Sequence, residues 1–219
     1  MPRTDLRVTR KRKPYHHGDL RRALVEAALS LLTKTQRWDF SLREVARCAN
    51  VSHNAPYFHF ASKRDLLAAV AAKGYEILHA RMLSALRGKK KPADALKAML
   101  IVYLRFGTEN PAHYRLMFGP TLQGQDGLPS EVIRAFGSAE TEVREVLKHG
   151  SEDRTFKIPQ NDHAALEIAT VAGWSIVHGL TMLYIEGLAT LETARMIDSL
   201  AEEVVAMFMY GLVRRSKQD

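Results

Sequence analysis

Cysteine is nearly absent from this sequence, since Cys48 is the single cysteine among 219 residues. One cysteine cannot form a disulfide within the chain, so we expect a reducing compartment, the cytoplasm. The position of Cys48 on a short segment with an apolar face predicts a packed side chain. A redox-sensing role is the alternative, and it would require a reaction partner that the sequence does not supply.

Long apolar runs are also missing. The first residues carry charge rather than an apolar segment, which predicts no secretory signal. The longest apolar stretch, residues 168–185, is at the lower edge of the length that spans a membrane. Two glycines and a histidine interrupt it, and glutamates rather than basic residues flank it. We expect no membrane partner and a helix that is buried in a bundle or a dimer.

Motifs of catalysis are absent as well. The sequence has no Gly-x-Ser-x-Gly elbow, no phosphate-binding loop and no Rossmann glycine pattern. The pairs His16–His17 and His53–His59 lack the cysteine or carboxylate spacing of a zinc site. We expect no catalytic residue, no metal and no cofactor. An enzyme with a basic tail is the residual alternative, which a turnover assay would test.

No stretch of useful length alternates apolar and polar residues as a strand does, and no repeat is visible. Apolar residues instead recur at helical spacing along most of the chain. A hydrophobic content of 46% with 26% charged residues is ordinary for a soluble globular protein. We therefore predict an all-α protein.

The positive charge of the chain is unevenly distributed. The net charge is +8, yet residues 1–64 contain 14 Lys and Arg against 5 Asp and Glu, a net of +9. Residues 65–219 contain 18 against 19, a net of −1. This split indicates a nucleic-acid-binding half that is joined to a neutral half.

The stretch 41–65, SLREVARCANVSHNAPYFHFASKRD, has the pattern of two short helices joined by a tight turn. Ser41 with Glu44, and Ser62 with Asp65, have the spacing of capping boxes, in which each side chain binds a free amide of the helix start. Asn50 tolerates the left-handed conformation that stops a helix abruptly. Helix, four-residue turn and helix is the architecture that places its second helix in the major groove of DNA.

With Val51-Ser52, Tyr57, His59-Phe60 and Lys63, this stretch resembles the DNA-binding domain of the tetracycline-repressor (TetR/AcrR) family of bacterial regulators. The resemblance covers about residues 15–78. Two positions depart from the family pattern, because Gln36 and Asn50 stand where the family has glycine. Within residues 174–179, Trp-x-x-x-His-Gly matches a Trp–His–Gly signature of one subgroup of these regulators.

The resemblance implies three parts: a basic arm at 1–17, a helix-turn-helix domain of three helices at 18–78, and a helical regulatory and dimerisation domain at 79–219. We expect a linker at 88–92, where glycine, three lysines and proline follow one another, and a polar loop at 150–161. The expected helices are 19–35 (capped by Asp19), 42–49, 52–60 (capped by Ser52), 63–86, 93–109, 111–118, 130–149, 162–186 and 191–215.

Residues 52–60 are the expected reading helix. Asn54 has the donor and acceptor to pair with adenine, and His53 can donate to guanine N7. In the family, the positions of Tyr57 and Lys63 contact phosphate. Phe58 either touches a thymine methyl group or turns inward and reads nothing. The basic arm either follows phosphates and the minor groove or is a solvated tail. The predicted DNA-binding residues are Arg10, Lys11, Arg12, Lys13, Ser41, Arg43, Ser52, His53, Asn54, Tyr57, Phe58, His59 and Lys63.

The resemblance also implies a homodimer formed through the last two helices, and an unknown small-molecule effector in an apolar pocket. The predicted effector-binding residues are Tyr103, Phe106, Tyr114, Met117, Phe118, Trp174 and His178. Each of them could instead be a core or dimer residue, and His178 could be a buried histidine with its hydrogen bonds satisfied.

These features predict a transcriptional regulator, a repressor that an effector releases from a palindromic DNA operator. Release would follow from a pivot of the helix at 63–86, which connects the two halves. The alternative is a constitutive DNA-binding or architectural protein without an effector, whose C-terminal half serves only for dimerisation.

Overall fold

The computed structural model describes residues 17–124, 127–188 and 194–213. Within these ranges the backbone is helical with short connections, and the one pairing of extended residues is an isolated bridge between Phe156 and Val213. The predicted all-α fold is confirmed. The predicted arm residues Arg10–Lys13 lie outside the described part of the chain.

The N-terminal domain consists of α1 (His17–Thr35), α2 (Leu42–Cys48), the 3-10 helix η1 (Ala55–Phe58) and the first turns of α3 (Lys63–Leu86). Apolar residues of the domain form its core, among them Leu24, Leu32, Val45, Phe60 and Leu66, each at most 2% exposed. Both predicted capping boxes are present, at Ser41–Glu44 before α2 and at Ser62–Asp65 before α3. The helix boundaries therefore follow from the local sequence.

The segment expected to be a reading helix over 52–60 is instead a single 3-10 turn between less regular turns, so that prediction was wrong in form. Pro56 has no amide hydrogen and cannot make the bond to Ser52 that would continue an α-helix. The amide of Ala55 donates to the Ser52 carbonyl (3.0 Å) and that of Tyr57 to the Asn54 carbonyl (3.1 Å), which is the tighter 3-10 pattern. Asn54 rather than Ser52 is the residue before this turn, and its side chain makes no cap.

Two smaller expectations in this domain were also wrong. Cys48 is exposed rather than packed, because it is the last residue of α2 and lies on the polar side of that helix. Asp19 lies inside α1, which begins two residues earlier than predicted.

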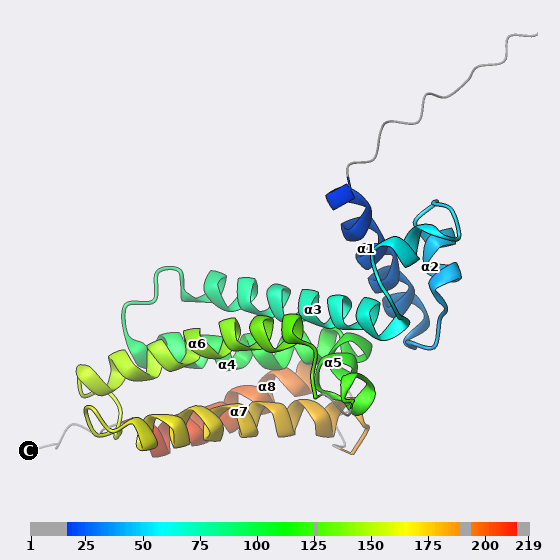
Figure 1. Ribbon diagram of the computed structural model, residues 1–219. Helices are drawn as coiled ribbons and strands as arrows, with labels where there is room; N and C mark the ends of the chain where they lie inside the picture. Colours follow the sequence, from blue (N-terminus) through cyan, green and yellow to red (C-terminus); the bar gives the residue numbers. More distant parts are fainter. Residues whose placement is uncertain (1–16, 125–126, 189–193, 214–219) are drawn as a thin grey trace, which may run out of the picture.

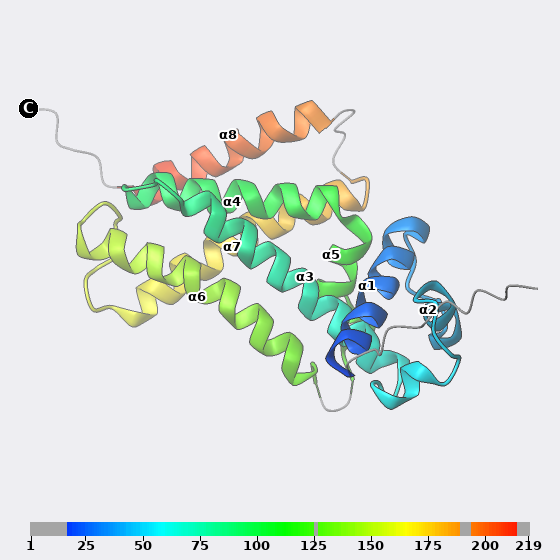
Figure 2. The same cartoon turned by 90° about the horizontal axis from the view of Figure 1, so that it is seen from above.

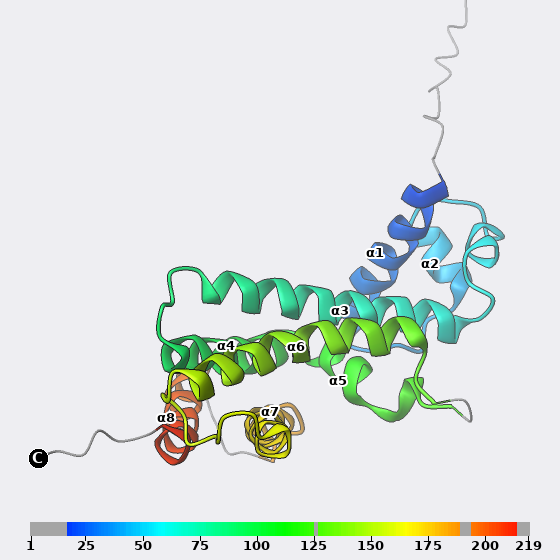
Figure 3. The same ribbon diagram turned by 60° about the vertical axis from the view of Figure 1, so that its left-hand side comes forward.

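The C-terminal domain is a bundle of α3 with α4 (Pro92–Glu109), α5 (Pro111–Phe118), α6 (Ser130–Glu152), α7 (His163–Ile185) and α8 (Ala194–Leu212), and a 3-10 turn η2 (Pro120–Leu122) follows α5. Figure 1 shows α1 and α2 at one end of α3, with the remaining helices beside the rest of it. Helix α4 packs against α3 on one side and against α7 and α8 on the other (Figure 2). Helices α7 and α8 lie on the side of the bundle away from α3 (Figure 3).

The predicted polar loop at 150–161 is more ordered and more apolar than expected. Helix α6 continues to Glu152, and the following segment buries Phe156 and Ile158 completely or nearly so. Because Gly150 has no side chain, the ring of Phe156 packs directly on its backbone. The segment thus folds back onto the end of α6 and caps that end of the bundle.

Within the described residues, α7 is the one helix that is long and apolar enough to cross a membrane. It packs against α4, α6 and α8 along one face. Its other face exposes Ile168 and Leu183.

Candidate DNA-binding surface and effector cavity

The predicted base-reading residues lie together on the tip of the N-terminal domain. Ser52, His53 and Asn54 are exposed, as are Tyr57 and Phe58 on the 3-10 turn. Buried Ala55, Pro56 and Phe60 fix this turn to the core. The buried residues therefore fix the backbone of the turn, and the exposed side chains on its outer face are not part of the core.

Phe58 points outward, and 81% of its surface is exposed. Of the two alternatives for this residue, the inward orientation is excluded. A large apolar side chain that is fully presented to solvent beside polar ones is what contact with a thymine methyl group requires. His59, by contrast, is half-buried rather than outward-facing.

The residues expected at the edges of this surface lie at helix starts. Ser41 and Arg43 are exposed at the start of α2. Lys63 begins α3, and its ammonium nitrogen lies 5.7 Å from the centroid of the Phe40 ring. Lys63 is the first residue of α3, so its positive charge lies at the helix N-terminus, a position where proteins commonly bind phosphate groups.

The two positions that depart from the family pattern share one backbone conformation. Gln36 has φ 55° and Asn50 has φ 54°, both in the left-handed region that glycine adopts most easily. Gln36 follows the last residue of α1, and its side-chain amide donates to the Thr33 carbonyl at 2.8 Å. At the second position, the amide of Val51 donates to the Ala46 carbonyl at 3.0 Å. At both positions a non-glycine residue thus adopts the left-handed backbone conformation that glycine adopts most easily.

A cavity of about 260 Å³ lies in the C-terminal domain among α3, α4, α6 and α7, with Phe118 of α5 at one side. Its wall is mostly apolar and aromatic, with two carboxylates. The lining residues are Tyr75, Leu78, Met82, Met99, Leu100, Tyr103, Phe118, Phe136, Ala139, Glu140, Val143, Glu167, Thr170, Val171, Trp174 and Val177.

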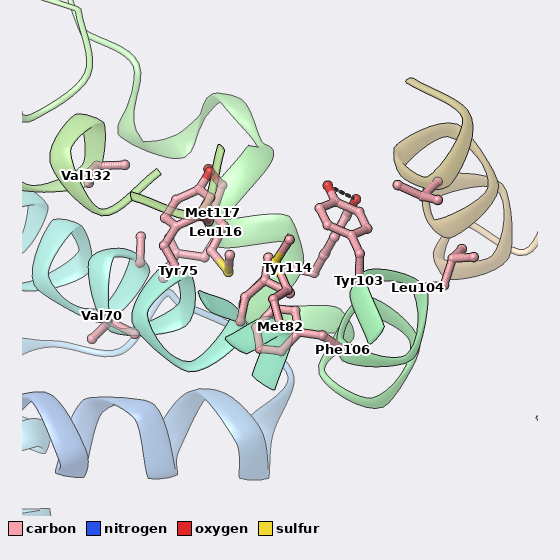
Figure 4. Packing of buried hydrophobic residues seen from close by; sticks show 14 of the residues in the cluster. Val70, Tyr75, Met82, Tyr103, Leu104, Phe106, Tyr114, Leu116, Met117 and Val132 are labelled. Atoms are coloured by element: carbon pink, nitrogen blue, oxygen red, sulfur yellow. Dashed lines mark hydrogen bonds between the residues drawn. The ribbon is translucent and has the colours of Figure 1, made fainter. Parts of the chain in front are cut away.

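Three of the predicted effector-binding residues, Tyr103, Phe118 and Trp174, line this cavity. The other four lie outside its lining: Phe106, Tyr114, Met117 and His178. Tyr114, Phe106 and Met117 are almost completely buried in the core (Figure 4). Whether any of the seven contacts an effector stays a prediction.

His178 forms part of a hydrogen-bonded cluster behind the cavity wall. Its Nδ1 lies 2.6 Å from the hydroxyl oxygen of Tyr114 and 3.1 Å from that of Tyr103. The two tyrosine oxygens are 2.8 Å apart (Figure 4), and the indole Nε1 of Trp174 donates to Tyr103 at 3.0 Å. Burial lowers the pKa of His178 and raises the pKa of both tyrosines, so all three are neutral at pH 7. The cluster is a satisfied polar network that holds the aromatic wall.

Helix α6 contributes residues to the cavity that are not among the predicted effector-binding residues. Glu140 and Arg144 have the i, i+4 spacing of a solvent-exposed ion pair, yet both are half-buried, and Glu140 lines the cavity. Phe136, Glu140 and Val143 recur at spacings of four and three residues, so they share one face of the helix. This spacing is the signal in the sequence that could have indicated a cavity-lining face of α6, because it places a glutamate between an aromatic and an aliphatic residue on the same face.

Arg144 joins two carboxylates at the edge of the cavity. Its Nη2 donates to Glu140 at 2.7 Å and its Nη1 donates to Glu167 of α7 at 2.7 Å. Hydrogen bonds to Glu167 and then Glu140 raise the pKa of Arg144. The three side chains carry a net charge of −1, so the cluster is acidic although it contains an arginine.

The two domains are tied together by arginines of the N-terminal domain. Arg21 of α1 binds Glu131 of α6 at 2.9 Å, and its guanidinium carbon lies 5.2 Å from the centroid of the Phe60 ring. Arg64, in the first turn of α3, donates to the carbonyls of Leu122 (2.9 Å) and Gly127 (2.7 Å). The base of the DNA-binding tip therefore contacts the start of α6 and the connection that precedes it.

Comparison with known proteins gives matches over both domains. The family model of tetracyclin repressor-like C-terminal domains matches residues 96–208, and that of bacterial regulatory proteins of the tetR family matches residues 24–70. The nucleoid occlusion factor SlmA of Photobacterium profundum is 27% identical over 157 residues, which is 70% of this chain and 80% of that protein.

Solved structures share the fold. A protein of unknown function from Rhodococcus sp. RHA1 is 26% identical, with a TM-score of 0.77 over 93% of this chain and 100% of that chain. A TetR family transcription regulator from Marinobacter aquaeolei VT8 is 17% identical, with a TM-score of 0.64 over 90% and 96% of the two chains. RolR in complex with its ligand resorcinol is 18% identical, with a TM-score of 0.62 over 87% and 88%.

Proposed function

Because this chain belongs to the TetR family of bacterial DNA-binding transcription regulators, we propose that it is a dimeric cytoplasmic repressor that a small molecule releases from a palindromic operator. The observation that carries the proposal is the pairing of an exposed reading surface with a cavity in the second domain. The two are joined by a continuous helix, α3, which begins at Lys63 on the DNA side and supplies Tyr75, Leu78 and Met82 to the cavity wall.

The surface chemistry supports sequence reading rather than charge attraction alone. Asn54 offers an amide that pairs with adenine, and Phe58 offers an apolar face for thymine. Tyr57 and Lys63 are placed to bind phosphate, which fixes position but carries no sequence information. One such tip covers few base pairs, so specificity requires two of them on one face of the duplex.

Exposed apolar residues on α7 and α8 support a homodimer. Ile168 and Leu183 are exposed on α7, and Met207 and Tyr210 on α8, with Met207 at 77%. Two adjacent helices that both present large apolar side chains to solvent are typical of a surface that pairs with a second protein. Pairing with an identical copy about a two-fold axis would match the symmetry of a palindromic site.

The contacts between domains support effector control. A ligand in the cavity would contact α3 and α6, and both helices also contact the DNA-binding domain, α3 through Lys63 over the Phe40 ring and α6 through the ion pair of Glu131 with Arg21. A ligand shifts the protein toward release only by its differential affinity for the DNA-incompetent arrangement. RolR, which has this fold, was crystallised with resorcinol.

A second candidate is a constitutive DNA-binding protein of the nucleoid without a small-molecule effector. It is favoured by the likeness to SlmA, whose name describes a nucleoid occlusion factor. In that case the C-terminal domain would serve for dimerisation, and no ligand of the cavity would change DNA affinity. The two candidates share the DNA-binding surface and differ only in the role of the cavity.

Selection of bound sites from a random duplex library tests the proposal. The expected result is a palindrome with half-sites about one or more helical turns apart. Asn54→Ala should yield a site relaxed at one base pair in each half, with a loss of roughly 1–3 kcal/mol on the original site. Glu145→Gln, an exposed change on α6 far along the chain from the tip, should select the same palindrome as the unaltered protein. Enrichment of no sequence at all would contradict the proposal.

A further inference from the structure

The hydrogen-bond donors in the cavity wall are used within the fold. The Tyr75 hydroxyl donates to the Met117 carbonyl at 3.0 Å, and the Thr170 hydroxyl donates to the Leu166 carbonyl at 2.9 Å. The indole of Trp174 donates to the Tyr103 oxygen. The Tyr103 hydroxyl, in turn, lies in the cluster with Tyr114 and His178 behind the wall. A ligand with a carboxylate or phosphate head would thus find these donors occupied.

The hydrogen-bond acceptors in the cavity wall, in contrast, are only partly used within the fold. Glu140 and Glu167 both line the cavity, and each ionised carboxylate has about four acceptor positions. Arg144 uses one oxygen of each, Oε1 of Glu140 and Oε2 of Glu167. The guanidinium is shared between two negative groups, so an added cation is attracted by the remaining net charge and an added anion is repelled.

The neighbouring aromatic rings also suit a cation. Phe136 and Trp174 both line the cavity, with ring centroids 5.7 Å apart, and Phe118 lies 6.3 Å from Trp174. The negative faces of such rings attract a cationic group within about 6 Å. The volume of about 260 Å³ is slightly below the range of pockets that hold drug-sized molecules, so the ligand is small.

From these observations we infer that the effector is a small lipophilic amine, protonated at neutral pH. Its ammonium group lies against Glu140 and Glu167, and its apolar body lies among Phe136, Val143 and Trp174. The inference rests on the proposed function in one respect, namely that this cavity is the effector site. It adds the chemical class of the ligand, which the family membership does not determine.

A matched set of probes tests the inference: 4-phenylbutylamine, 4-phenylbutanoate and 4-phenylbutanol, which share one apolar body and differ in head-group charge. Calorimetric titration of the full-length protein should show that the amine binds at least about tenfold more tightly than the carboxylate, since a hydrogen bond to a charged group is worth about one factor of ten or more. Equal or tighter binding of the carboxylate would overturn the inference, as would binding of none of the three.

Variants locate the site and the charge effect. Glu140→Gln and Glu167→Gln together should reduce amine affinity about tenfold and leave the alcohol unchanged, whereas Glu145→Gln on the exposed side of α6 should change neither. Ala139→Leu fills the cavity and should weaken the amine and the alcohol alike. If the amine preference survives both glutamine changes in a folded protein, the amine does not bind these carboxylates.

The same probes separate this inference from the proposed function. If the amine binds the cavity but leaves DNA affinity unchanged, the ligand class is correct and release by an effector is not. If the carboxylate binds and releases DNA, the cavity is an effector site and the inferred class is wrong.

Discussion

The guanidinium of Arg21 on α1 and the carboxylate of Glu131 on α6 form an ion pair across the two domains at 2.9 Å. Arg21 also lies over the ring of Phe60, which follows the 3-10 turn η1 of the proposed DNA-binding surface. About one to three helical turns along from Glu131, α6 supplies Phe136, Glu140 and Val143 to the cavity. One helix therefore lines the cavity and also contacts the base of the proposed reading surface.

We predict that Glu131→Gln changes coupling more than stability. The ion pair is partly exposed, and such pairs contribute about 0–1 kcal/mol, so chemical unfolding should show a small loss at most. A coupling free energy between cavity ligand and operator is typically about 1–3 kcal/mol, and this variant should reduce it. The measurement is operator affinity with and without a saturating cavity ligand. Glu145→Gln is the matched control, and unchanged coupling in Glu131→Gln would show that α6 does not transmit the signal.

Phosphate contacts should be separable from base contacts by their salt dependence. Lys63→Ala should weaken binding to specific and random duplexes by similar factors, and should reduce the slope of log affinity against log salt by about one. Tyr57→Ala should weaken both duplexes similarly but leave the slope unchanged, because its hydroxyl carries no charge. Affinities measured at four or more salt concentrations check both statements. A loss confined to the specific duplex in either variant would assign that residue to base reading.

The turn between α2 and the reading segment depends on the left-handed conformation of Asn50. Alanine is disfavoured at φ 54°, so Asn50→Ala should lower the free energy of unfolding by about 1 kcal/mol. Asn50→Gly should lower it by less, since glycine adopts this conformation without a steric penalty. Urea unfolding of the two variants provides the comparison. Equal losses in both would mean that the side chain of Asn50, rather than its backbone conformation, stabilises the turn.

Stability should fall in mild acid because His113 is buried in its neutral form. Its Nε2 donates to the Val70 carbonyl at 2.7 Å, and burial lowers its pKa from the ordinary value of 6.5. Below about pH 6.5 the unfolded chain binds a proton that the folded one does not. The free energy of unfolding should therefore decrease as the pH falls, by at most about 1.4 kcal/mol per pH unit for this residue, and it should be insensitive to pH just above that range.

Urea unfolding of the His113→Gln variant at pH 7.5, 6.5 and 5.5 measures the contribution of His113. Glutamine can still donate to Val70 but does not titrate, so the slope below pH 6.5 should become smaller. His53→Gln, a change at an exposed histidine, should keep the original slope. An identical slope in His113→Gln would assign the acid sensitivity to other groups, among which His178 also has a lowered pKa.

Local signals in the sequence predicted the N-terminal domain well. The serine and acidic residues three positions apart at 41–44 and 62–65 define helix starts by backbone capping alone, and both capping boxes formed. Pro111 and Gly119 likewise bound α5 where predicted. The predicted helix over 52–60 contains Pro56, and the amide hydrogen that this residue lacks is a local signal for the 3-10 turn that the structure has there.

The cavity was less predictable because it is formed by side chains from five helices. Tyr103, Phe118 and Trp174 were among the predicted effector-binding residues, whereas the i, i+4 spacing of Glu140 and Arg144 is that of an ordinary ion pair on the exposed face of a helix. Only the packing of α6 against α3 and α7 turns that pair toward the cavity and adds Glu167 to it. The packing of the Phe156 ring on Gly150 is a further contact between neighbouring segments that helical periodicity does not indicate.

The most direct test of the account is a titration of the selected palindrome and of a random duplex with purified protein at physiological salt, with the mass of each complex determined. We predict two protomers on the palindrome and an affinity at least about a thousandfold higher than for random DNA. A monomer that binds both duplexes with equal affinity would contradict it.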